Sequence, residues 1–196
     1  LLHLYFREQN HADAIHMTDI NYDNTTLHVN NMHTVFSNCT FSDSIVFVEG
    51  KNNETLALSN SIWLGIIHLS VTNLKSVMMY NCSFIYIVSS VREMVFLQEI
   101  SNVFLDRCIF QYSVGKMMQV QNVSAFLVNG LHVRSSASSD FQDTMCTVNA
   151  FSIENVETFF VTSSKFVNIS RFCSTFNIAA AGNIIVIDCI FSRSHC

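Results

Sequence analysis

The sequence predicts an all-β protein, a single-stranded parallel β-helix (a solenoid) of about eight coils with three short strands per coil and Asn-containing bends. A tetrad of Asn, Cys, any residue and an aromatic residue recurs along the chain, most clearly from Asn38 to Phe41. Successive copies begin 19 to 34 residues apart, which is the range of solenoid repeats. The copies begin at Asp19, Asn38, Asn60, Asn81, Arg107, Asn129, Ser163 and Asp188.

The composition agrees with a chain made mostly of strands. Of the 196 residues 49% are hydrophobic and 13% are charged, and many of the apolar residues are β-branched or aromatic. There is no proline. Proline cannot donate to a strand ladder, so its absence is typical of a chain whose segments are interior strands. We expect residues 1–196 to form a single β-helix domain, a segment of a longer solenoid or of a stack of copies joined end to end.

Alternation along the predicted strands indicates which side chains face the core. The residues four and two positions before each tetrad are almost all apolar, as in Val77 and Met79 before Asn81. Because side chains alternate between the two faces of a strand, the same parity directs the Asn of the tetrad inward. We therefore expect an inward amide ladder with an aromatic stack beside it. The predicted structural ladder consists of Asn38, Asn60, Asn81, Asn129, Phe41, Trp63, Phe84, Phe110, Phe166 and Phe191.

The tetrad alignment also places His132 in the aromatic column, where we expect a core histidine. A column of small core residues is expected at Cys39, Cys82, Cys108 and Cys189. A second signal, which reads apolar, any, Asn, apolar, predicts another bend in most coils. These second bends are expected at Asn31, Asn73, Asn102, Asn122 and Asn155, with Asn183 as the weakest copy.

The tetrad has a sequel of two residues and a serine, as in Phe41 to Ser44 and Phe110 to Ser113. This pattern resembles the repeats of right-handed parallel β-helices of the pectin-lyase-like kind. It is also similar to the Phe-x-x-Asn repeats of bacterial polymorphic outer-membrane and autotransporter passengers. The resemblance implies a right-handed coil, within a superfamily that holds lyases, hydrolases, phage spikes, adhesins and inert stalks.

No group of residues in the sequence predicts catalysis. Enzymes of this fold that cut polyuronates use clustered carboxylates, calcium and an Arg or Lys, whereas the aspartates here are scattered and no polygalacturonase-like string occurs. The histidines lack a metal-ligand spacing, and Asp140 and Asp143 supply fewer oxygens than calcium needs. We expect no cofactor and no metal, and enzymatic activity through carboxylates from distant coils is the weaker alternative.

Three cysteines lie in or just after the variable loops of successive coils, namely Cys146, Cys173 and Cys196. Adjacent coils are ~4.8 Å apart, within the Cα range of a disulfide, so we expect Cys173 to pair with Cys196 or with Cys146. The longest loop, Arg134 to Thr144, is expected to be a solvated insertion, with a carbohydrate-binding groove beside it as the alternative.

Six Asn-x-Ser/Thr sequons occur, at Asn24, Asn38, Asn53, Asn81, Asn122 and Asn168. Asn38, Asn81 and Asn122 fall in predicted bends, where we expect the amides to be inside. Asn24, Asn168 and Asn53 are expected to be exposed and to carry N-glycans. The glycans indicate an extracellular or cell-surface location reached by the secretory route.

The charge and hydropathy pattern limits the partners. The net charge is −5 and there is no basic cluster, so nucleic acid is not an expected partner. No apolar run approaches the ~20 residues of a membrane span. The favoured function is that of an extracellular structural or fibre-forming glycoprotein acting by assembly and surface display. The alternatives are a carbohydrate-active or carbohydrate-binding β-helix and a microbial surface adhesin or autotransporter passenger.

Overall fold

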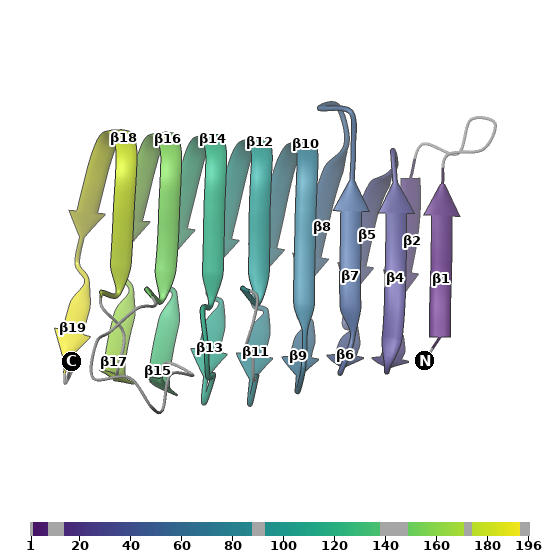
Figure 1. Ribbon diagram of the computed structural model, residues 1–196, viewed down its shortest axis with the longest axis horizontal. Helices are drawn as coiled ribbons and strands as arrows, with labels where there is room; N and C mark the ends of the chain where they lie inside the picture. The colour runs from purple at the N-terminus through teal and green to yellow at the C-terminus, as the bar shows by residue number, and fades with distance from the viewer. Residues whose placement is uncertain (1, 8–13, 88–92, 138–148, 171–173, 193–196) are drawn as a thin grey trace.

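The computed structural model describes residues 2–7, 14–87, 93–137, 149–170 and 174–192. These residues form a parallel β-solenoid of about seven turns, built from strands and without a helix (Figure 1), which confirms the predicted fold class. In Figure 1 the chain advances from right to left while the front strands run upward and the strands behind run downward. This sense of coiling is right-handed, as is usual for connections between parallel strands.

Three rows of strands run along the solenoid. The first row starts with β1 (Leu2–Arg7), β4 (Thr25–Asn30) and β7 (Ile45–Glu49), and the second row starts with β2 (Ala14–Thr18), β5 (His33–Ser37) and β8 (Thr55–Ser59). Further along, one bent strand spans both rows, in β10 (His68–Tyr80), β12 (Val95–Asp106), β14 (Met118–Asn129), β16 (Phe151–Thr162) and β18 (Phe176–Ile187). The third row contains β3 (Asn21–Asp23), β6 (Thr40–Ser42), β9 (Ile62–Leu64), β11 (Ser83–Ile85), β13 (Ile109–Gln111), β15 (His132–Ala137), β17 (Lys165–Ser170) and β19 (Ile190–Ser192).

The bend before the third row has the left-handed backbone that its asparagines favour. Asn38, Asn60 and Asn81 have φ angles of 54°, 50° and 51°. Asn adopts this region more readily than most residues because its short polar side chain can hydrogen-bond locally. Arg107 and Ser163 occupy the same place with φ angles of 54° and 51°. The bend is therefore imposed by the coil even where the residue does not favour it.

The bend between the first and second rows differs from the prediction in two coils. In β12 the residue with positive φ is Glu99 rather than Asn102, and in β18 it is Ala180 rather than Asn183. The strand register places both asparagines three residues beyond the bend, in the straight part of the strand. The residues with positive φ between the first and second rows are Asn31, Asn52, Asn73, Glu99, Asn122, Asn155 and Ala180, of which Asn52 was not predicted from the sequence.

The asparagines of the tetrads point outward, so the predicted inward orientation is wrong. Asn38, Asn60 and Asn81 are exposed. The left-handed residue interrupts the alternation, because Ser37 and Asn38 both face outward and the chain returns to the core at Cys39. Amide contacts between coils do occur, but on the exposed surface: Asn81 Nδ2 donates to Asn60 Oδ1 at 2.8 Å, and Asn155 Nδ2 donates to Asn122 Oδ1 at 3.1 Å.

In the coil that contains β14 and β15 the tetrad is shifted by one residue from its predicted position. Strand pairing aligns Phe110 with Val133, so the aromatic column holds a valine here. Gly130 takes the left-handed position with a φ of 63°, and Asn129 lies one residue before the bend. His132 is therefore only partly buried and is not the core histidine that the alignment predicts.

Aromatic rings stack inside the third row. Phe84 lies between Trp63 and Phe110, with ring centroids 5.8 Å and 4.5 Å away and planes within 15° of parallel. All three rings are fully buried. Val133 interrupts the stack before it resumes at Phe166. The stacked pairs of this row are Tyr22 and Phe41, Phe41 and Trp63, Trp63 and Phe84, Phe84 and Phe110, and Phe166 and Phe191.

Candidate functional site

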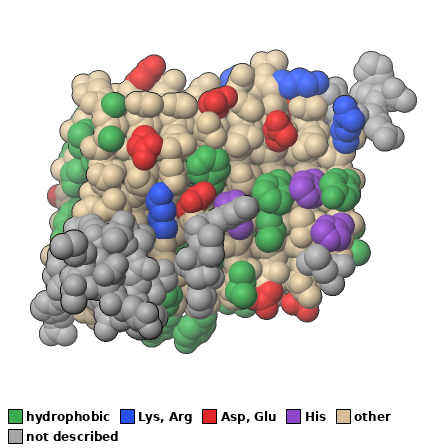
Figure 2. Space-filling model, viewed as in Figure 1, with side chains coloured by type: hydrophobic (Ala, Val, Ile, Leu, Met, Phe, Trp, Pro, Cys, Tyr) green, Lys and Arg blue, Asp and Glu red, His purple; other side chains and the backbone are tan. Residues whose placement is uncertain are grey.

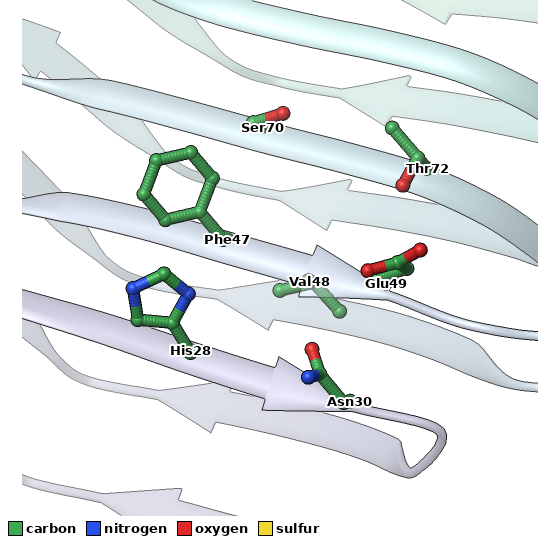
Figure 3. Close-up of a pocket in the computed structure, with 7 residues that line it drawn as sticks. All are labelled: His28, Asn30, Phe47, Val48, Glu49, Ser70 and Thr72. Carbon is green, nitrogen blue, oxygen red and sulfur yellow. The ribbon is translucent and has the colours of Figure 1, made fainter. Parts of the chain in front are cut away.

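A shallow depression of about 180 Å³ lies on the outer face of the first row, over β4, β7 and β10 (Figure 3). Each strand contributes outward side chains at alternate positions, and Val48 between them is buried on the core side. The parallel register then aligns these side chains across coils, because residues of neighbouring strands pair one to one. The depression is lined by His28, Asn30, Phe47, Val48, Glu49, Ser70 and Thr72.

One wall of the depression is part of an aromatic stack on the outside of the solenoid. The ring of His28 lies 4.6 Å from that of Tyr5 and 4.8 Å from that of Phe47, with interplanar angles of 5° and 16°. Figure 2 shows histidine and hydrophobic side chains beside one another over β1, β4 and β7. Because Tyr5 and Phe47 cover the two faces of its ring, His28 presents the edge of the ring to the depression. Tyr5, at the end of the stack, is 70% exposed.

The other wall is polar. Asn30, Glu49 and Thr72 pair across successive coils near the ends of β4 and β7 (Figure 3). None of these three side chains has a hydrogen-bond partner within the described part of the chain. They present an amide, a carboxylate and a hydroxyl to solvent in one row. Such a row can donate to and accept from the neighbouring hydroxyls of a sugar.

The polar groups in the lining of the depression are an imidazole, an amide, a carboxylate and two hydroxyls. Glu49 is the one carboxylate in its lining, whereas glycoside hydrolysis commonly uses a pair of carboxylates across the scissile bond. Among the described residues no three His, Cys, Asp or Glu side chains are grouped so that they could hold a metal ion. The predictions from sequence did not find this site, because its residues come from three coils and form no local motif.

The predicted glycosylation sites are exposed, and so are the three sequons that we expected to be inside. Asn24, Asn53 and Asn168 lie on the surface as predicted. Asn38, Asn81 and Asn122 are also exposed, because bend residues face outward. The structure therefore provides no steric reason to exclude any sequon asparagine. In Asn81, however, the amide nitrogen that would carry a glycan donates to Asn60.

The predicted disulfide partners Cys146, Cys173 and Cys196 lie outside the described residues, as do Asp140 and Asp143. The loop predicted from Arg134 begins later, because strand β15 continues to Ala137. The four described cysteines are free thiols, and Cys39 Sγ donates to the carbonyl of Met17 at 3.3 Å in the core. These thiols are Cys39, Cys82, Cys108 and Cys189.

The end of the solenoid at β18 and β19 exposes side chains that would face the core in an interior coil. Val186 is 50% exposed, whereas Val161, its partner in β16, is fully buried. Phe191 is 48% exposed, whereas Phe166 beneath it is 1% exposed. Among the described strands, both lie at the edge of their sheets and pair on one side. This end surface thus combines apolar side chains with unpaired strand edges, the features that drive strand addition.

The architecture defines this chain as a parallel β-solenoid protein. No protein-family model matches the sequence, and none of the curated proteins is significantly similar to it. The described residues include no helix that is long and apolar enough to cross a membrane.

Proposed function

We propose that this protein is an extracellular structural β-solenoid of the pectin-lyase-like kind, which acts by end-to-end assembly and by display of its outer surface. The observation that carries the proposal is the apolar end surface formed by β18 and β19. A further coil on this surface, from a longer chain or from another copy, would bury Ile184, Val186 and Phe191 and would pair two strand edges. The free energy gained is of the order of 1 kcal/mol or more per side chain.

The proposal of an extracellular glycoprotein is supported by the sequons. All six sequon asparagines are exposed, and five of them lie at positions with positive φ, where the chain turns and the side chain projects. A glycan at such a bend would extend into solvent without disturbing the strand ladders. We propose N-glycans at Asn24, Asn53 and Asn168, as the sequence predicts, on the secretory route. Release of no glycan mass by an amidase from protein secreted by eukaryotic cells would contradict this part of the proposal.

End-to-end assembly can be tested with charges on the end surface. Val186→Lys places an ammonium group among the exposed core residues of β18 and should keep rods apart by its desolvation cost. Asn177→Lys adds the same charge on the same strand, but at an exposed outward position. We expect sedimentation velocity and electron microscopy to show rods joined end to end for the wild-type chain and Asn177→Lys, and single rods for Val186→Lys. Single rods for the wild-type chain, or unchanged assembly of Val186→Lys, would refute the proposal.

A second candidate function is carbohydrate binding, which is favoured by the depression on β4, β7 and β10. It has a row of amide, carboxylate and hydroxyl groups beside aromatic rings, and ligand sites commonly combine apolar walls with a few polar groups. Calorimetric titration with oligogalacturonate and with a neutral β-glucan oligosaccharide tests it. We expect the neutral oligosaccharide to bind the wild-type chain and to lose affinity in Asn30→Ala and Glu49→Gln, whereas the carboxylate of Glu49 should repel the anionic oligogalacturonate. Binding of neither sugar would count against this candidate.

A further inference from the structure

The second row lies on the side away from the viewer in Figure 1. A stripe of side chains that is apolar from its second coil onward runs along the outer face of this row. We call it the outer stripe. Each coil contributes one residue to it, and the strand register aligns these residues in a single line. The outer stripe consists of His16 at its first coil and of the apolar residues Val35, Ala57, Met78, Phe104, Leu127, Phe160 and Ile185.

The fold itself does not require this stripe. The core is formed by the inward residues of the same strands, such as Val77, Met79 and Val103, which are fully buried. On the outer face Met78 is 46% exposed and Phe104 is 38% exposed. A sheet face in contact with water is normally polar, and a continuous line of apolar side chains on it marks an interaction surface.

We propose that the outer stripe is a lateral interface between two copies of this chain, which pack side by side. The first argument is charge. The columns of outward residues on either side of the stripe are neutral except for Asp106, which is paired with Arg107 at 3.2 Å, and His33, which shares a hydrogen bond with Thr55. The chain as a whole carries a net charge of −5, so like copies meet with least repulsion on this face. Such a surface also offers nothing to a highly charged partner.

The second argument is the repeat distance. Side chains of the outer stripe recur once per coil, at the ~4.8 Å spacing of neighbouring strands. A second copy presents the same spacing, so the side chains of two stripes can interdigitate along their whole length. A partner without this repeat would match the stripe at a few positions only.

The third argument is the area. About seven coil-to-coil steps of ~4.8 Å give a stripe ~34 Å long, and with the two flanking columns the face is ~20 Å wide. The resulting contact of ~700 Å² per copy is slightly below the ~800 Å² of a standard interface. A contact of this size is large enough for a specific dimer, whose affinity depends on how well the side chains pack. None of the six sequon asparagines belongs to the stripe or to its flanking columns, so N-glycans would leave its centre free.

The test uses Val186→Lys as background, which separates side-by-side from end-to-end contacts. Sedimentation equilibrium should show a dimer in this background. In the triple variant with Met78→Ser and Phe104→Ser we expect the dissociation constant to rise by about tenfold or more. Gln98→Lys, on β12 but on the outer face of the first row, is the matched control and should dimerise normally. Because these side chains face outward, thermal melts should show that all variants fold.

Three outcomes would overturn the lateral interface. The first is a monomer at about 100 µM in the Val186→Lys background. The second is dimerisation that is unchanged by Met78→Ser and Phe104→Ser. The third is binding of the monomer to phosphatidylcholine vesicles that these two substitutions abolish, which would assign the stripe to a lipid surface. If Val186→Lys fails to block end-to-end assembly, the proposed function is refuted. The lateral interface can then still be tested in the wild-type background, by comparing the cross-linking of the Met78→Ser and Phe104→Ser variant with that of the Gln98→Lys control.

Discussion

Asn38 could stabilise the coil in two ways, through its left-handed backbone conformation or through hydrogen bonds of its side-chain amide. Substitution of Asn38 distinguishes between them. Asn38 has a φ of 54° and its side chain is exposed. Within the described part of the chain its amide has no hydrogen-bond partner, whereas its backbone N–H donates to the carbonyl of Ser59 at 3.0 Å. The structure therefore indicates that Asn38 is needed for its backbone conformation and not for its amide.

The expected magnitudes follow from this conformation. The left-handed backbone conformation destabilises a residue that has a Cβ atom by about 1–2 kcal/mol. This penalty is absent for glycine and smaller for Asn. Asn38→Ala should therefore lower the free energy of unfolding by about 1 kcal/mol. Asn38→Gly should change the free energy of unfolding by no more than about 0.5 kcal/mol. Glycine relieves the backbone strain in the folded protein, but its greater backbone freedom in the unfolded chain offsets this gain.

The assay is urea denaturation of protein made in bacteria, where loss of the sequon at Asn38 has no effect on glycosylation. The change in midpoint at constant slope reports the difference in stability. Equal destabilisation by Asn38→Ala and Asn38→Gly would show that the amide itself stabilises the coil. That result would refute the assignment of Asn38 to backbone geometry.

Two further predictions concern the core and the pH dependence of stability. Phe84→Ala removes a fully buried ring that is stacked on both faces and should lower the free energy of unfolding by about 3–5 kcal/mol. Phe191→Ala, at the open end of the solenoid, should lower it by about 1 kcal/mol. Equal urea midpoints for the two variants would contradict this prediction. Partial burial, together with the charges of Arg134 and Lys165, lowers the pKa of His132 in the folded protein. The unfolded chain then binds the proton first, so stability should be complete above pH ~6.5 and should fall as the pH drops from there through the lower folded pKa. His132→Gln should flatten the pH dependence of the melting temperature in this range, and an unchanged slope would show that His132 is not its cause.

The class of fold could be predicted from the sequence alone. Every coil must bury a similar set of side chains in the same narrow core, so apolar pairs such as Val77 and Met79 recur before each bend, and aromatic residues such as Phe84 recur after it. The left-handed bends could also be predicted, because Asn is among the few residues that favour this conformation. Repetition makes these local preferences visible even though single copies are degenerate.

The direction of the bend side chains could not be derived from alternation. A left-handed residue breaks the period of two, and this places Asn38 outside and Cys39 inside. The same ambiguity led to the one-residue error at Asn129 and Gly130, since both residues suit a left-handed bend. The pairing of β13 with β15 resolves this ambiguity, because Phe110 is aligned with Val133 in the strand register.

The candidate binding surfaces became visible in the three-dimensional structure. The depression joins His28 and Asn30 to Glu49 and Thr72, and the outer stripe takes one residue from each coil. In sequence the equivalent residues of neighbouring coils are 19 to 33 positions apart and belong to no motif. They form continuous surfaces because the parallel register places equivalent positions of successive coils at the distance of neighbouring strands, ~4.8 Å.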